Sequence, residues 1–337
     1  MNLALIGSWG HFGQVLHETD AAGGFPIVAL AKALPDDDPA KAVRRYPSAS
    51  AAQIFDDPGR MLAEIKPDVA VVSTRLDLIP HLAMAAAAAG THLVCEKPLA
   101  LDTPRLEQLW ETVTTHGVQC LAMLNNRSDP ILAAARNAVA EGRIGEVKLL
   151  NARKSYRFGT RPEWFADRER YGGTIPWVGI HAFDFLDAVT ASPPVAVAAD
   201  HANTCHPEYP GCEDVATALV RLRNGALATI SVDYLRPESA ATHGDDWLRI
   251  VGTEGVVEAA MGRAEARILN NEAPEEALVP VSAQPYYVPL LRSLPAPGTA
   301  GPTEATRRAF RLTHTALCAR NAADSNTLAD IPQKPWS

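Results

Sequence analysis

The chain has 337 residues, of which 47% are hydrophobic and 21% charged, and its formal net charge is −8. These values describe a globular protein long enough for two domains, and they exclude a disordered chain. The negative charge gives no general attraction to nucleic acid or to an anionic membrane, so we expect a small-molecule substrate and neither of those partners.

The first third of the chain alternates apolar runs with helical segments. Its N-terminus lacks the basic and long apolar regions of a signal peptide, and no later apolar run could span a bilayer, so we expect a cytoplasmic protein. Because the strands are apolar throughout, they predict a parallel sheet with helices on both faces, assigned to residues 1–122. The predicted strands are 3–7, 26–31, 67–74, 91–96 and 118–124, and the helices are 14–22, 81–90 and 104–116.

Residues 123–337 are predicted to form a second domain of the α+β class. Long strand-like runs with few helices favour a mixed or antiparallel sheet. A proline-rich stretch at 272–303 predicts a long loop, and apolar residues at helical spacing predict a last helix at 306–323. The predicted strands are 145–156, 194–203, 215–223, 226–236 and the run 247–260.

A glycine-rich turn, LIGSWGHFGQ, follows the first strand and precedes the first helix. Glycine in this place allows a tight turn and lets a pyrophosphate approach the amides at the helix N-terminus. The turn therefore predicts a doubly wound, Rossmann-type dinucleotide site. Its candidate residues are Gly7, Ser8, Trp9, Gly10, His11, Phe12 and Gly13.

The end of the second strand bears on the choice between NAD and NADP. An NAD site usually has an acid here for the ribose diol, but alignment by the strand gives Lys32, and the acids at 36–38 come several residues later. Lys32 is either a solvated lysine or a cation that tolerates a 2′-phosphate. We lean towards NADP over NAD on this basis.

Polar residues follow two further strands of the predicted sheet. Ligands of such sheets lie beyond the carboxyl ends of the strands. Pro98 ends the strand before it, so Lys97 is expected at the strand's tip. The candidates at these two ends are Ser73, Thr74, Arg75, Glu96 and Lys97.

A histidine opens an apolar helical stretch after Gly172–Gly173. His181 and Asp184 are three residues apart, so both side chains can share a helix face. An imidazole oriented by a carboxylate can act as a general acid or base near neutral pH. The cysteine and histidine residues of CHPEYPGCED lack a usual zinc spacing, so we predict no metal site.

With these motifs in order, the chain resembles the Gfo/Idh/MocA family of nicotinamide-dependent oxidoreductases. CEKPLA matches its E-K-P motif, GG-x5-G-x-H-x-x-D matches its second-domain signature, and NNRSDP, EGRIGEV and LRIVGTEGVVE also match. The resemblance implies a Rossmann domain followed by a domain with a large open sheet, which often forms homodimers or homotetramers. It implies oxidation of a sugar or cyclitol hydroxyl, or reduction of the ketone. Lys97 would hydrogen-bond the reacting oxygen, His181 would relay its proton, and Asn125 would lie near the nicotinamide.

Three residues depart from the family pattern: Trp9 in the glycine turn, Lys32, and Trp177 in place of an aspartate four residues before the histidine. The proton relay must then be shorter or use Asp184, while Trp177 either lines the substrate pocket or fills the core. A catalytically silent dinucleotide-binding regulator and a redox-assisted elimination or hydrolysis stay as alternatives. The other candidates for the substrate pocket are Arg153, Tyr156, Trp164 and His243.

Overall fold

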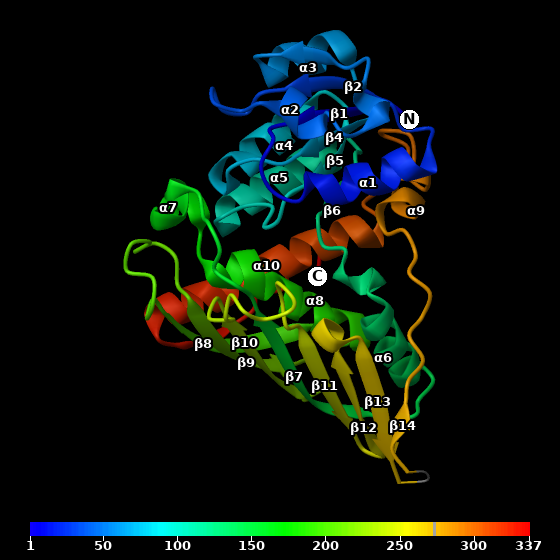
Figure 1. Cartoon of the computed structure of the whole chain (residues 1–337), viewed down its shortest axis with the longest axis vertical. Coiled ribbons are helices and arrows are strands. Elements are labelled where there is room, and N and C mark those ends of the chain that lie inside the picture. The colour runs from blue at the N-terminus through cyan, green and yellow to red at the C-terminus, as the bar shows by residue number, and fades with distance from the viewer. Residues whose placement is uncertain (272–273) are drawn as a thin grey trace. The chain divides into compact units, whose positions relative to one another are not determined.

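The computed structural model describes residues 1–271 and 274–337 (Figure 1). Contacts divide the chain into two compact units. The first comprises Met1–Met123, Pro285–Thr313 and Trp336, and the second comprises Leu124–Gln284, His314–Pro335 and Ser337. Residues 285–313, which the sequence prediction left with the second domain, therefore pack with the first.

The first unit contains a six-stranded sheet in the order β3-β2-β1-β4-β5-β6, with every pair parallel. β1, β4 and β5 are buried along their whole length, as the continuous apolar runs predicted. This is the expected doubly wound architecture. The strands are β1 (Leu3–Ile6), β2 (Ile27–Ala31), β3 (Gln53–Phe55), β4 (Val69–Val72), β5 (His92–Cys95) and β6 (Cys120–Ala122).

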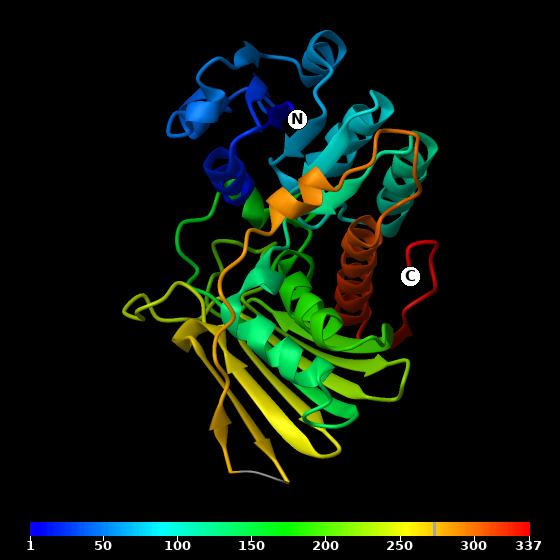
Figure 2. The same cartoon turned by 90° about the vertical axis from the view of Figure 1, so that its right-hand side faces the viewer.

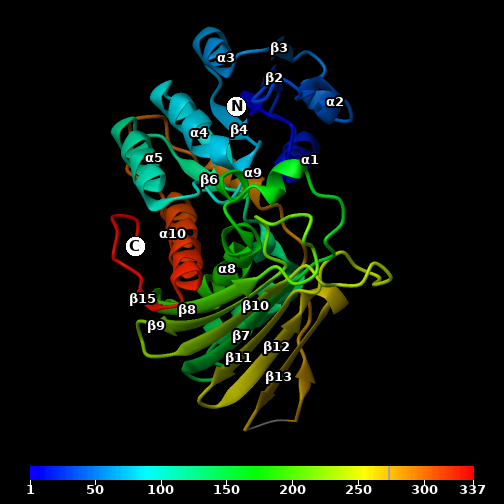
Figure 3. The same ribbon diagram turned by 90° about the vertical axis from the view of Figure 1, so that its left-hand side faces the viewer.

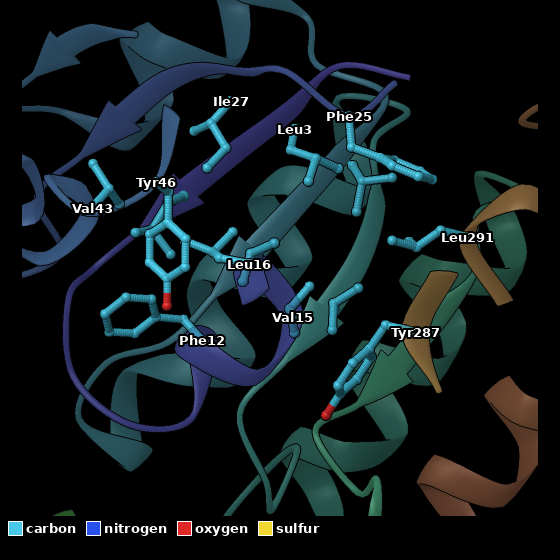
Figure 4. Packing of buried hydrophobic residues seen from close by; sticks show 14 of the residues in the cluster. Leu3, Phe12, Val15, Leu16, Phe25, Ile27, Val43, Tyr46, Tyr287 and Leu291 are labelled. Atoms are coloured by element: carbon cyan, nitrogen blue, oxygen red, sulfur yellow. The ribbon is translucent and has the colours of Figure 1, made fainter. Parts of the chain in front are cut away.

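Helices cover this sheet, and one of them comes from the far end of the chain. α9 packs against α1, and its Tyr287 and Leu291 join the core formed around Leu3 and Val15 (Figure 4). The helices are α1 (Phe12–Ala22), α2 (Pro39–Val43), α3 (Pro58–Ile65), α4 (Ile79–Ala88), α5 (Thr103–Thr115) and α9 (Tyr287–Arg292).

The second unit contains a nine-stranded mixed sheet in the order β14-β13-β12-β11-β7-β10-β9-β8-β15. Among the pairs of this second sheet in the described residues, only β7 and β10 are parallel, with Lys154 opposite Val232. The strands are β7 (Val147–Ser155), β8 (Pro194–Ala202), β9 (Val215–Leu222), β10 (Leu227–Asp233), β11 (Trp247–Gly252), β12 (Gly255–Ala260), β13 (Glu265–Asn270), β14 (Glu276–Ala277) and β15 (Leu328–Asp330).

Helices lie along one face of the nine-stranded sheet and leave the other face open (Figures 2 and 3). Side chains alternate accordingly: Ala228 and Ile230 are buried, whereas Leu227 and Thr229 are exposed. The predicted mixed, open sheet is thus confirmed. The helices of this unit are α6 (Pro130–Ala140), α7 (Arg168–Tyr171) and α8 (Ile180–Val189), and α10 (Glu304–Ser325) belongs to this unit from His314 onward.

The predicted long loop at 272–303 is wrong in part, because β14 and α9 lie within it. The many prolines of this stretch predicted a loop, but buried side chains of α9 hold that helix against α1. Residues 272–273 of that prediction lie outside the described residues. Within residues 1–271 and 274–337, no helix combines the length and the apolarity needed to cross a membrane.

Candidate functional site

The glycine-rich turn closes tightly against the end of β4. Gly7 and Gly10 have φ angles of +83° and +105°, which are backbone conformations that strain any residue other than glycine. A Cβ on Gly7 would lie 2.4 Å from the carbonyl oxygen of Ser73, and a Cβ on Gly10 would lie 2.2 Å from Oε2 of Glu96. The turn therefore needs glycine at both positions, for conformation and for space.

Glu96 fastens this turn to the E-K-P segment. Its buried carboxylate accepts hydrogen bonds from the backbone N–H of His11 (2.5 Å) and from the N–H of Lys97 (3.0 Å), and it pairs with Nδ1 of His11 at 3.0 Å. Burial alone would raise the pKa of Glu96. The charge of His11, its hydrogen bonds and the charge of Lys97 outweigh that effect and hold the pKa below its usual value.

The end of β4 completes the same edge of the sheet. Ser73 Oγ donates to the carbonyl of Trp9 at 2.6 Å, and the Trp9 N–H donates to the carbonyl of Ser73 at 3.1 Å. Thr74 Oγ1 is buried and has no hydrogen-bond partner in the described part of the chain. Arg75 forms a bidentate pair with Asp77 (2.6 and 2.9 Å), so its guanidinium is held by its own loop.

The segment after β2 gives Lys32 a partner and brings an acid to the turn. Lys32 Nζ lies 2.9 Å from Oδ1 of Asp56, which raises the pKa of the lysine. Asp37 folds back so that Oδ2 accepts from the N–H groups of Ala33 and Leu34 at 2.9 Å, while Ser8 Oγ donates to Oδ1 at 3.0 Å. Asp37, which the strand alignment passed over, therefore contacts the glycine-rich turn.

These residues fit a dinucleotide. The turn is a cradle that a single Cβ would fill, it leads into the N-terminus of the eleven-residue helix α1, and an orphaned buried hydroxyl lies beside it. Glu96 and Lys97 follow β5 directly in the same unit, and the side chains of both are buried. The predicted cofactor residues of the turn and of the β4 and β5 ends thus lie along one edge of one sheet.

In the second unit, His181 lies in the first turn of α8, after a π-helical turn at Ile175–Gly179. Wide turns of this kind are frequent at functional sites. The segment that leads into this π-helical turn is held by Glu213, whose Oε2 accepts a hydrogen bond from the N–H of Thr174 at 2.9 Å. Gly172 and Gly173 have φ angles of +81° and +106°, so the chain enters the turn through the irregular backbone that a glycine pair allows.

Asp184 has a cationic partner that the sequence did not point to. Its buried Oδ1 accepts from Nε of Arg127 at 2.6 Å, and Arg127 also pairs with Asp187. Burial alone would lower the pKa of Arg127, but the two carboxylates outweigh it and raise that pKa. Arg127 lies in the short helical turn Asn126–Ser128, directly after the predicted Asn125, so this turn is fastened to α8.

The predicted substrate residues lie on two faces of the sheet. Tyr156 stacks on His243, with ring centroids 5.2 Å apart, just beyond the end of β7. Arg153 points to the open face instead, where it bonds Asp245 (2.7 Å) and lies over Trp247. The structure therefore brings Tyr156 and His243 together and separates Arg153 from them.

Trp164 and Trp177 belong to one group of aromatic side chains. The ring of Phe165 lies 4.6 Å from that of Trp164, 4.3 Å from that of Tyr171 and 6.3 Å from that of Trp177, the last pair edge to face. Trp177 is buried, with 5% of its surface exposed. Its ring therefore packs into the core of the second unit.

The segment 205–214 is organised by one carboxylate. Asp214 accepts hydrogen bonds from the N–H groups of Thr204 (2.8 Å), Cys205 (2.5 Å) and His206 (3.1 Å), so this carboxylate stabilises the turn. In the described residues, no group of three or more histidine, cysteine or acidic side chains is arranged to hold a metal ion.

Comparison with known proteins places this geometry in a family. Residues 1–124 match the family model "Oxidoreductase family, NAD-binding Rossmann fold", and residues 132–258 match "GFO/IDH/MocA C-terminal domain". The chain is 29% identical to myo-inositol dehydrogenase Hyg17 of Streptomyces leeuwenhoekii over 99% of this chain and all of that protein. It is 28% identical to inositol 2-dehydrogenase of Rhizobium meliloti, over 57% of each.

Solved structures agree. A putative oxidoreductase from Thermotoga maritima superposes with a TM-score of 0.88 at 30% identity, over 98% of this chain and all of that one. A levoglucosan dehydrogenase in complex with NADH has the same fold, with a TM-score of 0.81 at 19% identity over 99% of this chain and all of its own. The resemblance seen in the E-K-P and G-x-H-x-x-D motifs is confirmed, and the chain belongs to the Gfo/Idh/MocA family of oxidoreductases, with an NAD-binding Rossmann domain.

Proposed function

We propose that this protein is a nicotinamide-dependent oxidoreductase that acts on a CH–OH group of a sugar, cyclitol or related polyol, or on the corresponding ketone. The observation that carries the proposal is the first unit's edge, where the cradle of Gly7 and Gly10 is fastened through Glu96 to the segment that bears Lys97. The full-length similarity to a myo-inositol dehydrogenase supports the substrate class. The dinucleotide, when bound, supplies the hydride acceptor or donor.

Two residues carry the proton chemistry in this proposal. The ammonium of Lys97 hydrogen-bonds the reacting oxygen and stabilises the negative charge that develops on it. The imidazole of His181 takes the hydroxyl proton, or returns it in the reverse direction. Asp184 acts as a positioning residue: its ion pair with Arg127 fixes α8 one turn beyond the imidazole.

The test is turnover of polyols by wild type, Lys97→Ala and His181→Ala, followed by absorbance of the reduced nicotinamide. Each substitution should reduce kcat by about two orders of magnitude or more. Lys148→Ala is the control, because Lys148 is half exposed on the second unit's sheet and pairs only with the exposed Glu146 among the ion pairs of the described residues. Wild-type kcat in both variants would return Lys97 and His181 to structural roles.

The choice of cofactor depends on Asp37 and Lys32. A carboxylate can accept hydrogen bonds from a ribose diol, and Asp37 already contacts Ser8 of the turn. We propose that Asp37 binds the ribose and favours NAD, while the Lys32 expectation of NADP stands as the alternative, since a surface ion pair such as Lys32–Asp56 is readily exchanged for a phosphate. Affinities of both cofactors for wild type, Asp37→Asn and Lys32→Ala decide: Asp37→Asn should weaken NAD alone, whereas loss of NADP in Lys32→Ala would favour the alternative.

A silent dinucleotide-binding regulator is the second candidate. The observation in its favour is Trp177, a buried ring at the place where the family commonly has an aspartate. An indole cannot accept a proton, so it cannot replace the carboxylate in a relay. Tight NADH binding by a wild type that turns over no polyol or ketone would support this candidate.

We further propose that copies of the chain pair through the open face of the nine-stranded sheet. Leu219 and Leu227 are 50% and 40% exposed there, beside a depression of about 800 Å³. Exposed apolar groups on a broad face mark interaction surfaces. Sedimentation velocity should show a dimer or tetramer for wild type and a smaller species for Leu219→Glu; a monomeric wild type would contradict the proposal.

A further inference from the structure

A buried ion pair at the end of β7 takes no part in the chemistry proposed above. Lys154 lies one residue before the end of the strand and its side chain is fully buried. Its ammonium pairs with Asp246, which directly precedes β11 and keeps 17% of its side chain exposed. Burial alone would lower the pKa of Lys154, but Tyr156 and Asp246 together raise it, so the lysine is a cation at neutral pH.

This pair lies at the same end of the sheet as the helix that carries His181. Lys154 Nζ is 5.0 Å from the ring centre of Phe185, which is one turn after His181 on α8. Lys154 is also paired across the sheet with Val232, and a Cβ on Gly179, two residues before His181, would lie 3.5 Å from that valine. Both ends of the helix segment around His181 therefore border the Lys154 position within the second unit.

One oxygen of the Asp246 carboxylate can accept a further hydrogen bond. Asp246 Oδ2 is bound to Lys154, but its Oδ1 is buried without a hydrogen-bond partner in the described part of the chain. Buried acceptors in native proteins nearly always have a hydrogen-bond partner, so we expect a bound molecule to supply a donor to this oxygen. Since Lys154 already balances the charge, a neutral donor such as a hydroxyl suits the site better than a second cation.

A flat aromatic surface lies beside the ammonium that holds this carboxylate. The ring of Tyr156 lies 4.9 Å from Lys154 Nζ and stacks on His243, which is exposed. Polyol rings present both hydroxyl donors and faces of C–H groups, and they match a carboxylate next to an aromatic plane. Ionised carboxylates and dianionic phosphate monoesters lack the donor that Oδ1 needs.

We propose that Asp246, held by Lys154, accepts a hydrogen bond from a hydroxyl of the polyol that is not the one oxidised, and so selects substrates that carry a second hydroxyl. This inference rests on the proposed function. It names a specificity residue, not a catalytic one, because Asp246 would contact the substrate away from the reacting carbon.

The experiment is a cycle between one side chain and one hydroxyl. Wild type and Asp246→Asn are compared on myo-inositol and on its monodeoxy derivatives, with KM and kcat measured separately. For one derivative, wild type should lose about tenfold or more in kcat/KM, whereas Asp246→Asn should lose little between the two substrates. The substitution should act mainly on KM. Equal losses for every derivative in both proteins would overturn the proposal, since a merely structural ion pair predicts that result.

Asp245→Asn is the matched control, because Asp245 is the neighbouring residue but binds Arg153 on the opposite, open face of the sheet. It should leave the discrimination unchanged. If Asp246→Asn does not fold, Asp246→Glu keeps the charge and moves the oxygen, and it should change which derivative is discriminated against; an unchanged order would overturn the inference.

Failure of the proposed function has a separate readout. A wild type that oxidises none of these polyols contradicts the proposed function, and the inference is then judged by equilibrium binding of myo-inositol measured by calorimetry. Binding that is weakened in Asp246→Asn but not in Asp245→Asn supports the role of Asp246. No binding to wild type, or equal binding to all three proteins, overturns it.

Discussion

Replacing Gly10 by alanine would test whether the cradle is built around Glu96. The new Cβ would lie 2.2 Å from Oε2 of Glu96 and 2.9 Å from Oγ of Ser73. Carbon and oxygen atoms cannot approach so closely, so the carboxylate must leave the backbone N–H of His11, which it accepts at 2.5 Å. The change therefore removes both the turn's conformation and its fastening to the E-K-P segment.

The size of the effect follows from two terms. An L side chain in left-handed backbone costs about 1–2 kcal/mol. Losing hydrogen bonds to a buried, charged acceptor costs a further amount of about 1.5–3 kcal/mol. Gly10→Ala should thus lower the free energy of unfolding of the first unit by about 2.5–5 kcal/mol.

Gly24→Ala separates the two terms. Gly24 has a φ of +80°, but a Cβ there would meet nothing within 4 Å, so only the conformational cost applies. Urea unfolding and NADH titration should be run on both variants. We expect Gly10→Ala to bind NADH about tenfold or more weaker than Gly24→Ala. Equal stability and equal NADH affinity in the two variants would refute the role given to Glu96.

Three further predictions concern buried groups. The folded pKa of Glu96 lies below the unfolded value of about 4.3, so the stability that its ionised form contributes is complete above pH 4.3 and is lost as the pH falls through the folded pKa. Acid should therefore destabilise Glu96→Gln less than wild type, as measured by urea unfolding across a pH series. Parallel stability curves for the two proteins would contradict this. Arg127→Met should lower the free energy of unfolding by about 3–5 kcal/mol, because it leaves the buried Asp184 without this cation, and a loss no larger than that of Arg127→Lys would count against it. Trp177→Ala should cost about 3–5 kcal/mol, because the ring is buried against Phe165, and calorimetric unfolding close to wild type would argue for a ring outside the core.

Much of the architecture could be predicted because it depends on local periodicity. The apolar runs at 3–7 and 67–74 became β1 and β4, and the run 247–260 divides between Gly252 and Gly255 into β11 and β12. The glycine-rich turn was recognisable for a similar reason: its place between a strand and a helix constrains the backbone, and the structure gives Gly7 and Gly10 the positive φ angles that this requires.

Other features depend on contacts between distant segments and leave no local signal. Asp37 comes five residues after the position expected for an acid, and only the folding back of 33–38 brings it to Ser8. Arg127 reaches Asp184 across 57 positions, and Lys154 reaches Asp246 across 92. A carboxylate near a cation in space cannot be told from a solvated charge by sequence spacing alone.

The position of β7 has a consequence for synthesis of the protein. β7 ends at Ser155, yet its two neighbours in the sheet, β10 and β11, begin only at Leu227 and Trp247. Because synthesis proceeds at about 5–20 residues per second, roughly 4 to 15 seconds pass between the completion of β7 and the start of β10, and during this time both edges of β7 are unpaired. Unpaired strand edges recruit other chains. Slower growth at low temperature or a holding chaperone should therefore raise the yield of folded protein, and fragments that stop between 155 and 227 should be found mainly in the insoluble fraction.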